Sequence, residues 1–413
     1  MNAPSSVGGR APLAAALAAV LLASFAQMTM QPATAPLVLE LGLEPWHVGV
    51  AVAASAAMML VAAPTWMRVV HRHGARGPIV SAMLIATAAM TVVAVLVMLA
   101  PRVGIPTWVV VIALVALRGL ALGACIAAIV PAARLVIDAT QDDAWRMRGL
   151  AGIASVQGIS IVVGVGLGGG LSSFGALVPV AASPLLLGIG ALAVALGVPR
   201  GIRAAPAGEP ATKSARSLVD ARTWPFAVAA LALLASVACV QIVLGFVLHE
   251  RFDLDAPMTG FATGWVLLAG GLAAVVAQTR IARVARRGAV LVRVGLAFAA
   301  VGVGGLAIAD GLLAVLAAIV LSGVGVGLAL PGIARAAGAV TRDRSTTQLL
   351  MGTMTVLGVV VGPPVGTVLL GIGTMAPLIA FGAVLVGAFA LSLAHPAFRA
   401  AATPTPVAGA AAI

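Results

Sequence analysis

Residues 107–137 read TWVVVIALVALRGLALGACIAAIVPAARLVI, an apolar run in which Arg118 is the only charged side chain before Arg134. A helix of about 20 apolar residues spans a hydrocarbon core of about 30 Å. This stretch is therefore long enough to cross a membrane. Eleven other apolar stretches occur along the chain, separated by short segments rich in charge, Pro or Gly.

The composition agrees with a membrane environment for the whole chain. Hydrophobic residues make up 62% of the 413 residues, charged residues 9%, and the mean hydropathy is +1.16. Soluble domains carry about a quarter charged residues. We therefore predict an all-α integral membrane protein with twelve transmembrane helices. The predicted spans are 12–39, 46–67, 78–100, 107–137, 149–171, 176–198, 225–247, 258–279, 289–309, 311–335, 347–370 and 377–394.

The basic residues predict the orientation of these helices. Lys and Arg favour cytoplasmic loops, and 21 of the 24 fall in segments that share one side when both termini are cytoplasmic. The remaining three are Arg102, Arg251 and Arg118. The pattern predicts a multi-pass protein of the cell inner membrane with both termini in the cytoplasm.

Two halves of six helices each are predicted from a weak internal repeat. A shift of 200 residues superposes several glycines and Pro131 on Pro331, as expected for repeats that form two pseudo-symmetric bundles around a midplane site. The predicted division is a bundle at 1–198, a linker at 199–222, a bundle at 223–398 and a disordered tail at 399–413.

Polar side chains in the spans are candidates for a substrate cavity. An intramembrane ionisable residue usually marks a transport pathway, and Arg118 lies deep in its span; a structural role, with hydrogen bonds to helix carbonyls, is the alternative. Helical spacing on the first span predicts one polar face. Isolated glutamines occur on two further spans. The predicted cavity residues are Ser24, Gln27, Gln31, Thr34, Arg118, Gln157 and Gln241.

Proton coupling requires a titratable group, yet no Asp or Glu lies in the middle of a predicted span. Glu40, at the end of the first span, and Arg118 are the candidates. The chain shows no Walker A motif, no His or Cys cluster for a metal and no nucleophile beside a base, so we expect no enzyme, cofactor or metal. The net charge of +12 does not predict nucleic-acid binding, because the basic residues form no continuous basic face.

The segment from Met67 to Arg76 resembles the loop between helices 2 and 3 of the major facilitator superfamily, patterned G-x-x-x-D-R-x-G-R-R. It keeps Arg72, Gly74 and Arg76. Met67, His71 and Ala75 replace the first glycine, the acidic residue and the penultimate basic residue. The resemblance implies a gating role for Arg72, Gly74 and Arg76.

Two further motifs are similar to the twelve-helix drug:proton antiporter branch. The segment from Arg118 to Gly123 resembles the helix 4 motif, which implies a role for Arg118 in proton or substrate coupling. The helix 5 antiporter motif G-x-x-x-G-P-x-x-G-G is blurred, since residues 164–170 lack the proline. Its closer copy lies in helix 11 and is expected to pack helices; it consists of Gly358, Gly362, Pro363 and Gly366.

Together these features predict a secondary transporter that works by alternating access and exports amphipathic small molecules, such as drugs, with proton coupling. Two alternatives remain open: a transporter of an anionic metabolite or siderophore without proton coupling, and a membrane receptor or scaffold that does not transport. The expected partners are a small-molecule substrate, the bilayer and, for the antiporter, protons. The expected state is a monomer.

Overall fold

The computed structural model describes residues 10–139, 143–200, 202, 223–281, 288–341 and 343–400. Within these ranges twelve helices are long and apolar enough to cross a membrane, and each overlaps one of the twelve predicted spans. Most of the predicted linker and tail lies outside the described residues, although residues 399 and 400 belong to α16. The all-helical, twelve-span fold is therefore confirmed.

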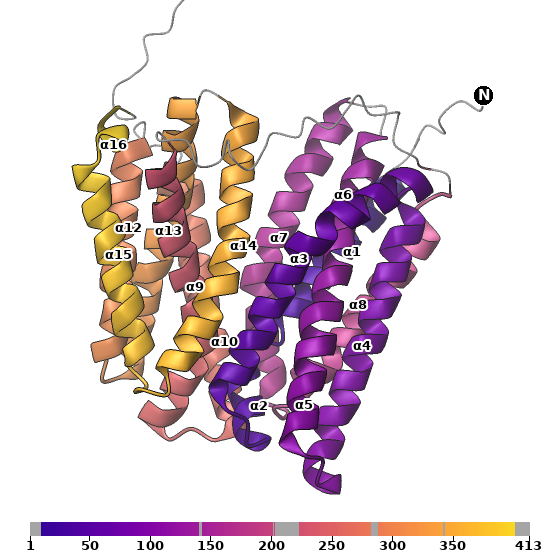
Figure 1. The fold of residues 1–413 in the computed structure, drawn as a ribbon, viewed down its shortest axis with the longest axis horizontal. Coiled ribbons are helices and arrows are strands. Elements are labelled where there is room, and N and C mark those ends of the chain that lie inside the picture. The colour runs from indigo at the N-terminus through magenta and orange to yellow at the C-terminus, as the bar shows by residue number, and fades with distance from the viewer. Residues whose placement is uncertain are drawn as a thin grey trace, which may run out of the picture. The chain divides into compact units, whose positions relative to one another are not determined.

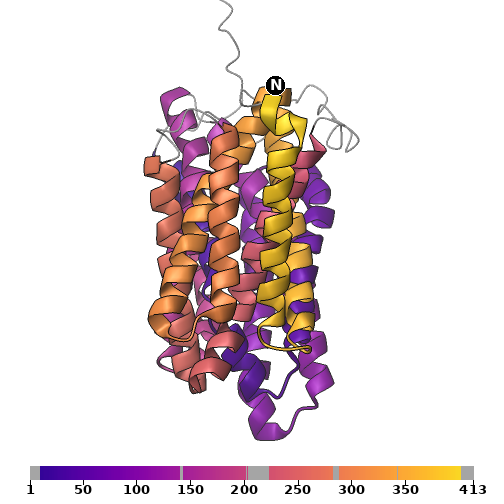
Figure 2. The ribbon, with the colours of Figure 1, turned by 90° about the vertical axis from the view of Figure 1, so that its left-hand side faces the viewer.

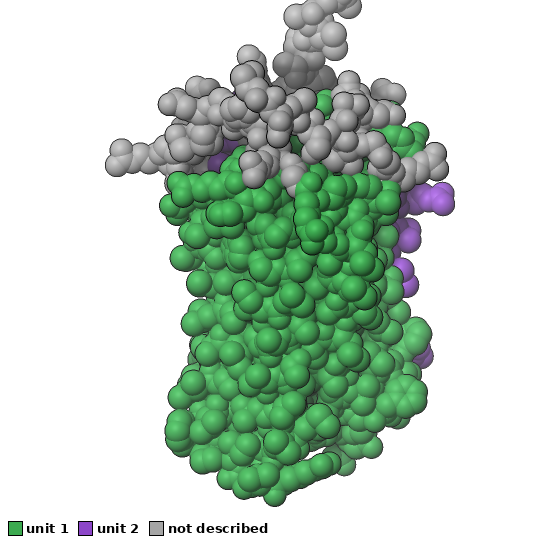
Figure 3. All heavy atoms as spheres, turned by 90° about the vertical axis from the view of Figure 1, so that its right-hand side faces the viewer, with its two compact units in different colours: residues 1–210, 238–268, 359–377 green, residues 211–237, 269–358, 378–413 purple. Residues whose placement is uncertain are grey.

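Contacts between Cα atoms divide the chain into two compact units, coloured separately in Figure 3. Unit 1 contains residues 1–210, 238–268 and 359–377, and unit 2 contains residues 211–237, 269–358 and 378–413. Three long helices contribute one part to each unit. They are α9 (Trp224–Phe252), α10 (Ala256–Val276) and α14 (Arg344–Leu369).

Unit 1 holds the elements of the first six spans, which run side by side in Figure 1 from indigo to magenta. They are α1 (Arg10–Met28), α2 (Thr34–Glu40), α3 (Pro45–His73), α4 (Arg76–Val103), α5 (Thr107–Ala113), η1 (Leu114–Ala121), α6 (Leu122–Asp138), α7 (Asp143–Ser172) and α8 (Val178–Gly197). We call the end of this unit that carries the turns at 41–44, 104–106 and 173–177 the distal end.

The first span differs from its prediction, because residues 29–33 interrupt the helix. Pro32 supplies no backbone donor, so a regular helix cannot continue through it without losing a hydrogen bond. At the break, the hydroxyls of Thr29 and Thr34 donate to the carbonyls of Phe25 (2.9 Å) and Met30 (3.2 Å). Irregular backbone at membrane depth persists where protein buries it, and Thr29 is fully buried.

Glycines on α7 let this interrupted backbone approach closely. A Cβ atom on Gly168 would lie 2.8 Å from Thr29 Cα, whereas a Cβ atom on Gly170 would meet nothing within 4 Å. Small residues at helix interfaces permit such contacts in membranes, where packing replaces the hydrophobic effect as the source of helix association. Gly168 therefore fixes the position of the helix break against α7.

Unit 2 contains α12 (Gly288–Ile308), α13 (Leu312–Thr341), α15 (Ala376–Ala394) and α16 (Pro396–Ala400), which face the viewer in orange and yellow in Figure 2. Glycines spaced seven residues apart on α12 face the backbone of α13. A Cβ atom on Gly295 would lie 2.7 Å from Gly325 O, and one on Gly302 would lie 2.7 Å from Ala318 O. The π-helical η3 (Ala277–Ile281) follows α10.

Substituting Gly168 and Gly170 by alanine tests the close packing on α7. Gly168→Ala forces the Thr29 backbone away from α7, and overpacking of this kind costs about 1–3 kcal/mol. Gly170→Ala has open space and gains up to about 1 kcal/mol of helix propensity. We expect thermal unfolding in detergent to give a lower melting temperature for Gly168→Ala only. Equal melting temperatures for the two variants would contradict the close contact.

Candidate functional site

Arg118 lies on η1, a π-helical segment between α5 and α6, and is 4% exposed. π-Helical turns are rare and are frequent at functional sites. No signal in the sequence predicted this segment. The structure thus places Arg118 on an irregular turn within its span, where the side chain is buried.

Two glycines that follow Arg118 let α3 pack against this segment. A Cβ atom on Gly119 would lie 3.0 Å from Ala51 O, and one on Gly123 would lie 2.8 Å from Ser55 Cα. Larger side chains would push α3 away. The spacing of the two glycines therefore places α3 beside the guanidinium of Arg118.

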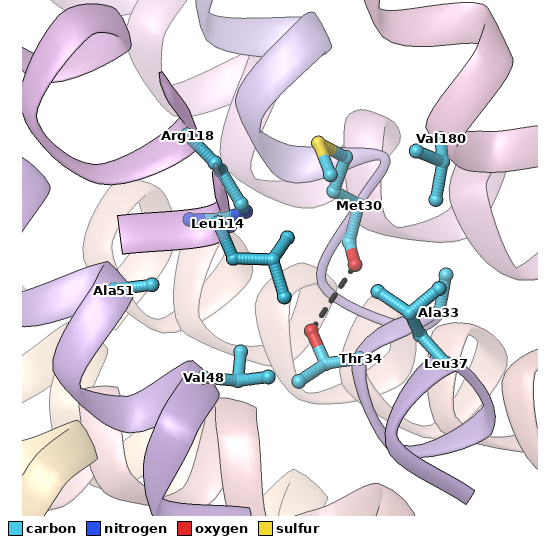
Figure 4. A pocket seen from close by; sticks show the side chains of 9 residues that line it. All are labelled: Met30, Ala33, Thr34, Leu37, Val48, Ala51, Leu114, Arg118 and Val180. Carbon is cyan, nitrogen blue, oxygen red and sulfur yellow. Dashed lines mark hydrogen bonds between the residues drawn. The ribbon is translucent and has the colours of Figure 1, made fainter. Parts of the chain in front are cut away.

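Arg118 borders a small cavity of about 10 Å³, close to the minimum needed for one water molecule. Figure 4 shows its side chain near the break in the first span. The walls come from the break, α2, α3, η1 and α8. The other lining residues are Met30, Ala33, Thr34, Leu37, Val48, Ala51, Leu114 and Val180.

The polar groups around this cavity are few. Among the described residues, no hydrogen bond or ion pair joins the Arg118 guanidinium to a protein group. The Thr34 hydroxyl is engaged with Met30 O at 3.2 Å. Gln31, next to Met30 in the break, has a buried amide oxygen without a hydrogen-bond partner in the described structure. Buried polar groups are normally satisfied, so Arg118 and Gln31 retain capacity for a ligand.

The predicted cavity residues separate into two groups. Arg118 and Thr34 line the same cavity, and Gln31 is buried in the break next to Met30, which also lines it. Ser24 and Gln27 are half-buried on α1, Gln241 is half-buried on α9, and Gln157 is exposed on α7. The predicted continuous polar face is wrong, because the helix break separates Gln31 and Thr34 from Ser24 and Gln27. Pro32 and Pro36 were the sequence signals for that break.

Glu40 is the last residue of α2 and is exposed at the distal end. Partial desolvation raises the pKa of its carboxyl above the ordinary value of 4.5. A carboxyl with a raised pKa binds a proton more readily than a free one. Partial burial therefore makes Glu40 easier to protonate than a fully solvated carboxyl.

The predicted gating loop is shorter than expected, since α3 extends through His73 and only Gly74 and Ala75 separate it from α4. Gly74 ends α3 with φ +85°, a conformation that favours glycine. The Ala75 amide donates to Ile202 O at 3.2 Å, and the Arg76 guanidinium donates to Ala195 O. Arg72 is exposed.

The helix 11 motif lies on α14, and residues on that helix contact neighbouring helices within each unit. In unit 2, a Cβ atom on Gly358 would lie 2.8 Å from Leu234 Cβ. In unit 1, a Cβ atom on Gly366 would lie 3.2 Å from Val243 Cγ2, and Pro363 O lies 3.0 Å from a Cβ atom placed on Gly49. Gly362 also belongs to α14.

The twelve helices that are long and apolar enough to cross a membrane, in the described part of the chain, define a multi-pass membrane protein. A sequence model of the Major Facilitator Superfamily matches residues 16–334. The chain belongs to this family. It is therefore a secondary transporter of the major facilitator type.

Solved structures agree with this assignment at the level of the fold. An inward-facing, occupied bacterial homologue of the human lysosomal transporter Spinster has a TM-score of 0.74, with 14% identity over 95% of this chain and 98% of that chain. The nucleoside transporter NupG has a TM-score of 0.65 and 12% identity, over 96% of this chain and 100% of that chain. An inward-facing bacterial homologue of the iron transporter ferroportin has a TM-score of 0.66 and 15% identity, over 95% of this chain and 99% of that chain. No curated protein sequence matches the chain.

Arg118→Met distinguishes a functional arginine from a structural one. A buried charge without a partner is costly, and an apolar replacement of similar length is often neutral or stabilising. We expect the melting temperature in detergent to be unchanged or higher. The control Arg134→Met removes an exposed charge from α6. If only Arg118→Met lowers the melting temperature, by more than about 5 °C, Arg118 has the structural role.

Proposed function

We propose that this chain is an alternating-access exporter of amphipathic small molecules, with Arg118 in the binding site and a proton as the coupling ion. The observation that carries the proposal is the buried Arg118 guanidinium, without a protein partner among the described residues, in an otherwise apolar pocket. Such a pocket suits a ligand with a large apolar body and one or two hydrogen-bond acceptors. In the proposed orientation, the protein lies in the cell inner membrane with both termini in the cytoplasm.

Substrate entry requires the cavity to enlarge, because about 10 Å³ holds no organic molecule. The helix break supplies a route, since Met30 and Ala33 within it line the cavity. Discontinuous helices form substrate sites in secondary transporters because they expose backbone and polar groups at membrane depth. Movement of α2 relative to α1 would bring Gln31 and Thr34 toward the substrate.

A set of close backbone contacts within unit 1 supports alternating access. At the distal end, a Cβ atom on Gly169 would lie 2.6 Å from Gly264 Cα, and one on Gly245 would lie 2.8 Å from Ala35 Cβ. Here α9 and α10 contact α2 and α7 through small residues. Such surfaces separate without disentangling long side chains, as a gate that opens and closes requires.

Proton coupling is assigned to Glu40 and Arg118. In this proposal Glu40 takes the proton at the distal end, because its raised pKa makes the carboxyl easier to protonate than a fully solvated one. Arg118 contributes to coupling by binding the substrate. Its fixed positive charge attracts a hydrogen-bond acceptor on the substrate and repels a cation. The proposed cycle binds a proton when the distal end is accessible and releases it on the opposite side.

A second candidate is transport of an organic anion without proton coupling. It is favoured by the same guanidinium, because an anionic group would supply the missing counter-charge within an apolar span. Ferroportin-like, nucleoside and lysosomal transporters share the fold, and the fold alone does not choose among substrates.

Flux into proteoliposomes separates these proposals. We expect an imposed pH gradient to accelerate movement of a neutral amphipathic probe. Arg118→Gln should lower that flux at least tenfold, and Glu40→Gln should remove only its gradient-dependent part. Arg134→Gln is the matched control, because it removes an exposed arginine from the adjoining helix.

Other outcomes have defined meanings. Flux of an organic anion that is abolished by Arg118→Gln but indifferent to pH would reject proton-coupled export and support the second candidate. Saturable binding of the probes with no flux in either direction would make the chain a membrane receptor. Unaltered flux in Arg118→Gln would reject Arg118 as a substrate-binding residue.

A further inference from the structure

A second, larger cavity lies at the opposite end of unit 1 from the distal turns. Its volume is about 510 Å³, within the range of about 300–1,000 Å³ typical of ligand pockets. It is formed where α3 ends, α4 begins and α8 ends. The cavity shares no lining residue with the cavity at Arg118.

Basic side chains line this cavity from two sides. Arg76, at the start of α4, and Arg200, after α8, face it together with His73, and Ser81 adds a hydroxyl. Among the described residues that line it, none is acidic. Arg76 donates one hydrogen bond to Ala195 O, which leaves other N–H donors of its guanidinium for a ligand. Guanidinium groups bind phosphate oxygens in a bidentate geometry.

One and two turns after Arg76, on the same face of α4, the lining of the cavity is apolar. Val80 and Leu84, one turn apart on α4, line the cavity, and Leu84 is 53% exposed. A soluble phosphate would gain nothing from these side chains. An acyl chain would cover them, because a hydrocarbon surface on a membrane-spanning helix contacts lipid tails.

We propose that this cavity binds an anionic phospholipid, with its phosphate at Arg76 and Arg200 and its acyl chains along Val80 and Leu84. Basic pockets between transmembrane helices near the membrane surface attract anionic headgroups. The proposal does not depend on the transported substrate. It assigns Arg76 a ligand in addition to its bond to Ala195.

Native mass spectrometry of the full chain, released from detergent and titrated with phosphatidylglycerol, tests this site. The matched comparisons are Arg200→Gln, Arg76→Gln and Arg102→Gln, an exposed arginine at the distal end. Each basic side chain at a membrane surface is worth about a fivefold change in affinity. We expect Arg200→Gln and Arg76→Gln each to weaken binding about fivefold, and Arg102→Gln to leave it unchanged.

Arg200→Gln keeps the proposal testable if Arg76→Gln fails to fold, since Arg200 lies outside the helices. Titrations with phosphatidylcholine and with glycerol 3-phosphate separate headgroup charge from free phosphate. The proposal is supported if phosphatidylcholine and glycerol 3-phosphate each bind more weakly than phosphatidylglycerol. Equal binding of phosphatidylglycerol by wild type and Arg200→Gln would overturn it, as would glycerol 3-phosphate that binds as tightly as the lipid.

Discussion

Close contact between helix backbones is the constraint on which the rest of this structure depends. Lipid tails are as apolar as leucine side chains, so helices in a bilayer associate through packing and not through the exclusion of water. Gly119 and Gly123 permit α3 to pack closely against the helix that carries Arg118. Gly168 permits the backbone at Thr29 to pack closely against α7. Gly295 and Gly302 join α12 to α13 in the same manner.

These contacts allow the chain to bury features that lipid would not tolerate. The interruption at residues 29–33 leaves backbone groups outside regular helix geometry, and the π-helical turn at Arg118 places a charge inside a span. Both are stable only where protein surrounds them. They meet at one small cavity, and a site built from such irregular parts can change shape with little loss of regular hydrogen bonding. That combination underlies the proposed transport cycle.

Much of the fold was predictable from the sequence because the bilayer restricts the choices. Apolar length predicted all twelve spans, and Arg118 was identified as a candidate because a charge is rare in a span. Periodicity alone failed in the first span, since the spacing of polar residues matched a helix that Pro32 interrupts. The π-helical turn at Arg118 and the cavity at Arg76 and Arg200 depend on contacts between distant segments. Local patterns do not encode such contacts.

The central claim is that the distal end of unit 1 opens and closes. Double electron–electron resonance between spin labels on Phe174→Cys and Met258→Cys tests it directly. Both side chains are exposed, Phe174 in a distal turn and Met258 in the first turn of α10. The buried Cys125 and Cys239 would be replaced by alanine. We predict two distance populations whose ratio changes with pH or transported substrate. A single short distance under every condition would contradict alternating access.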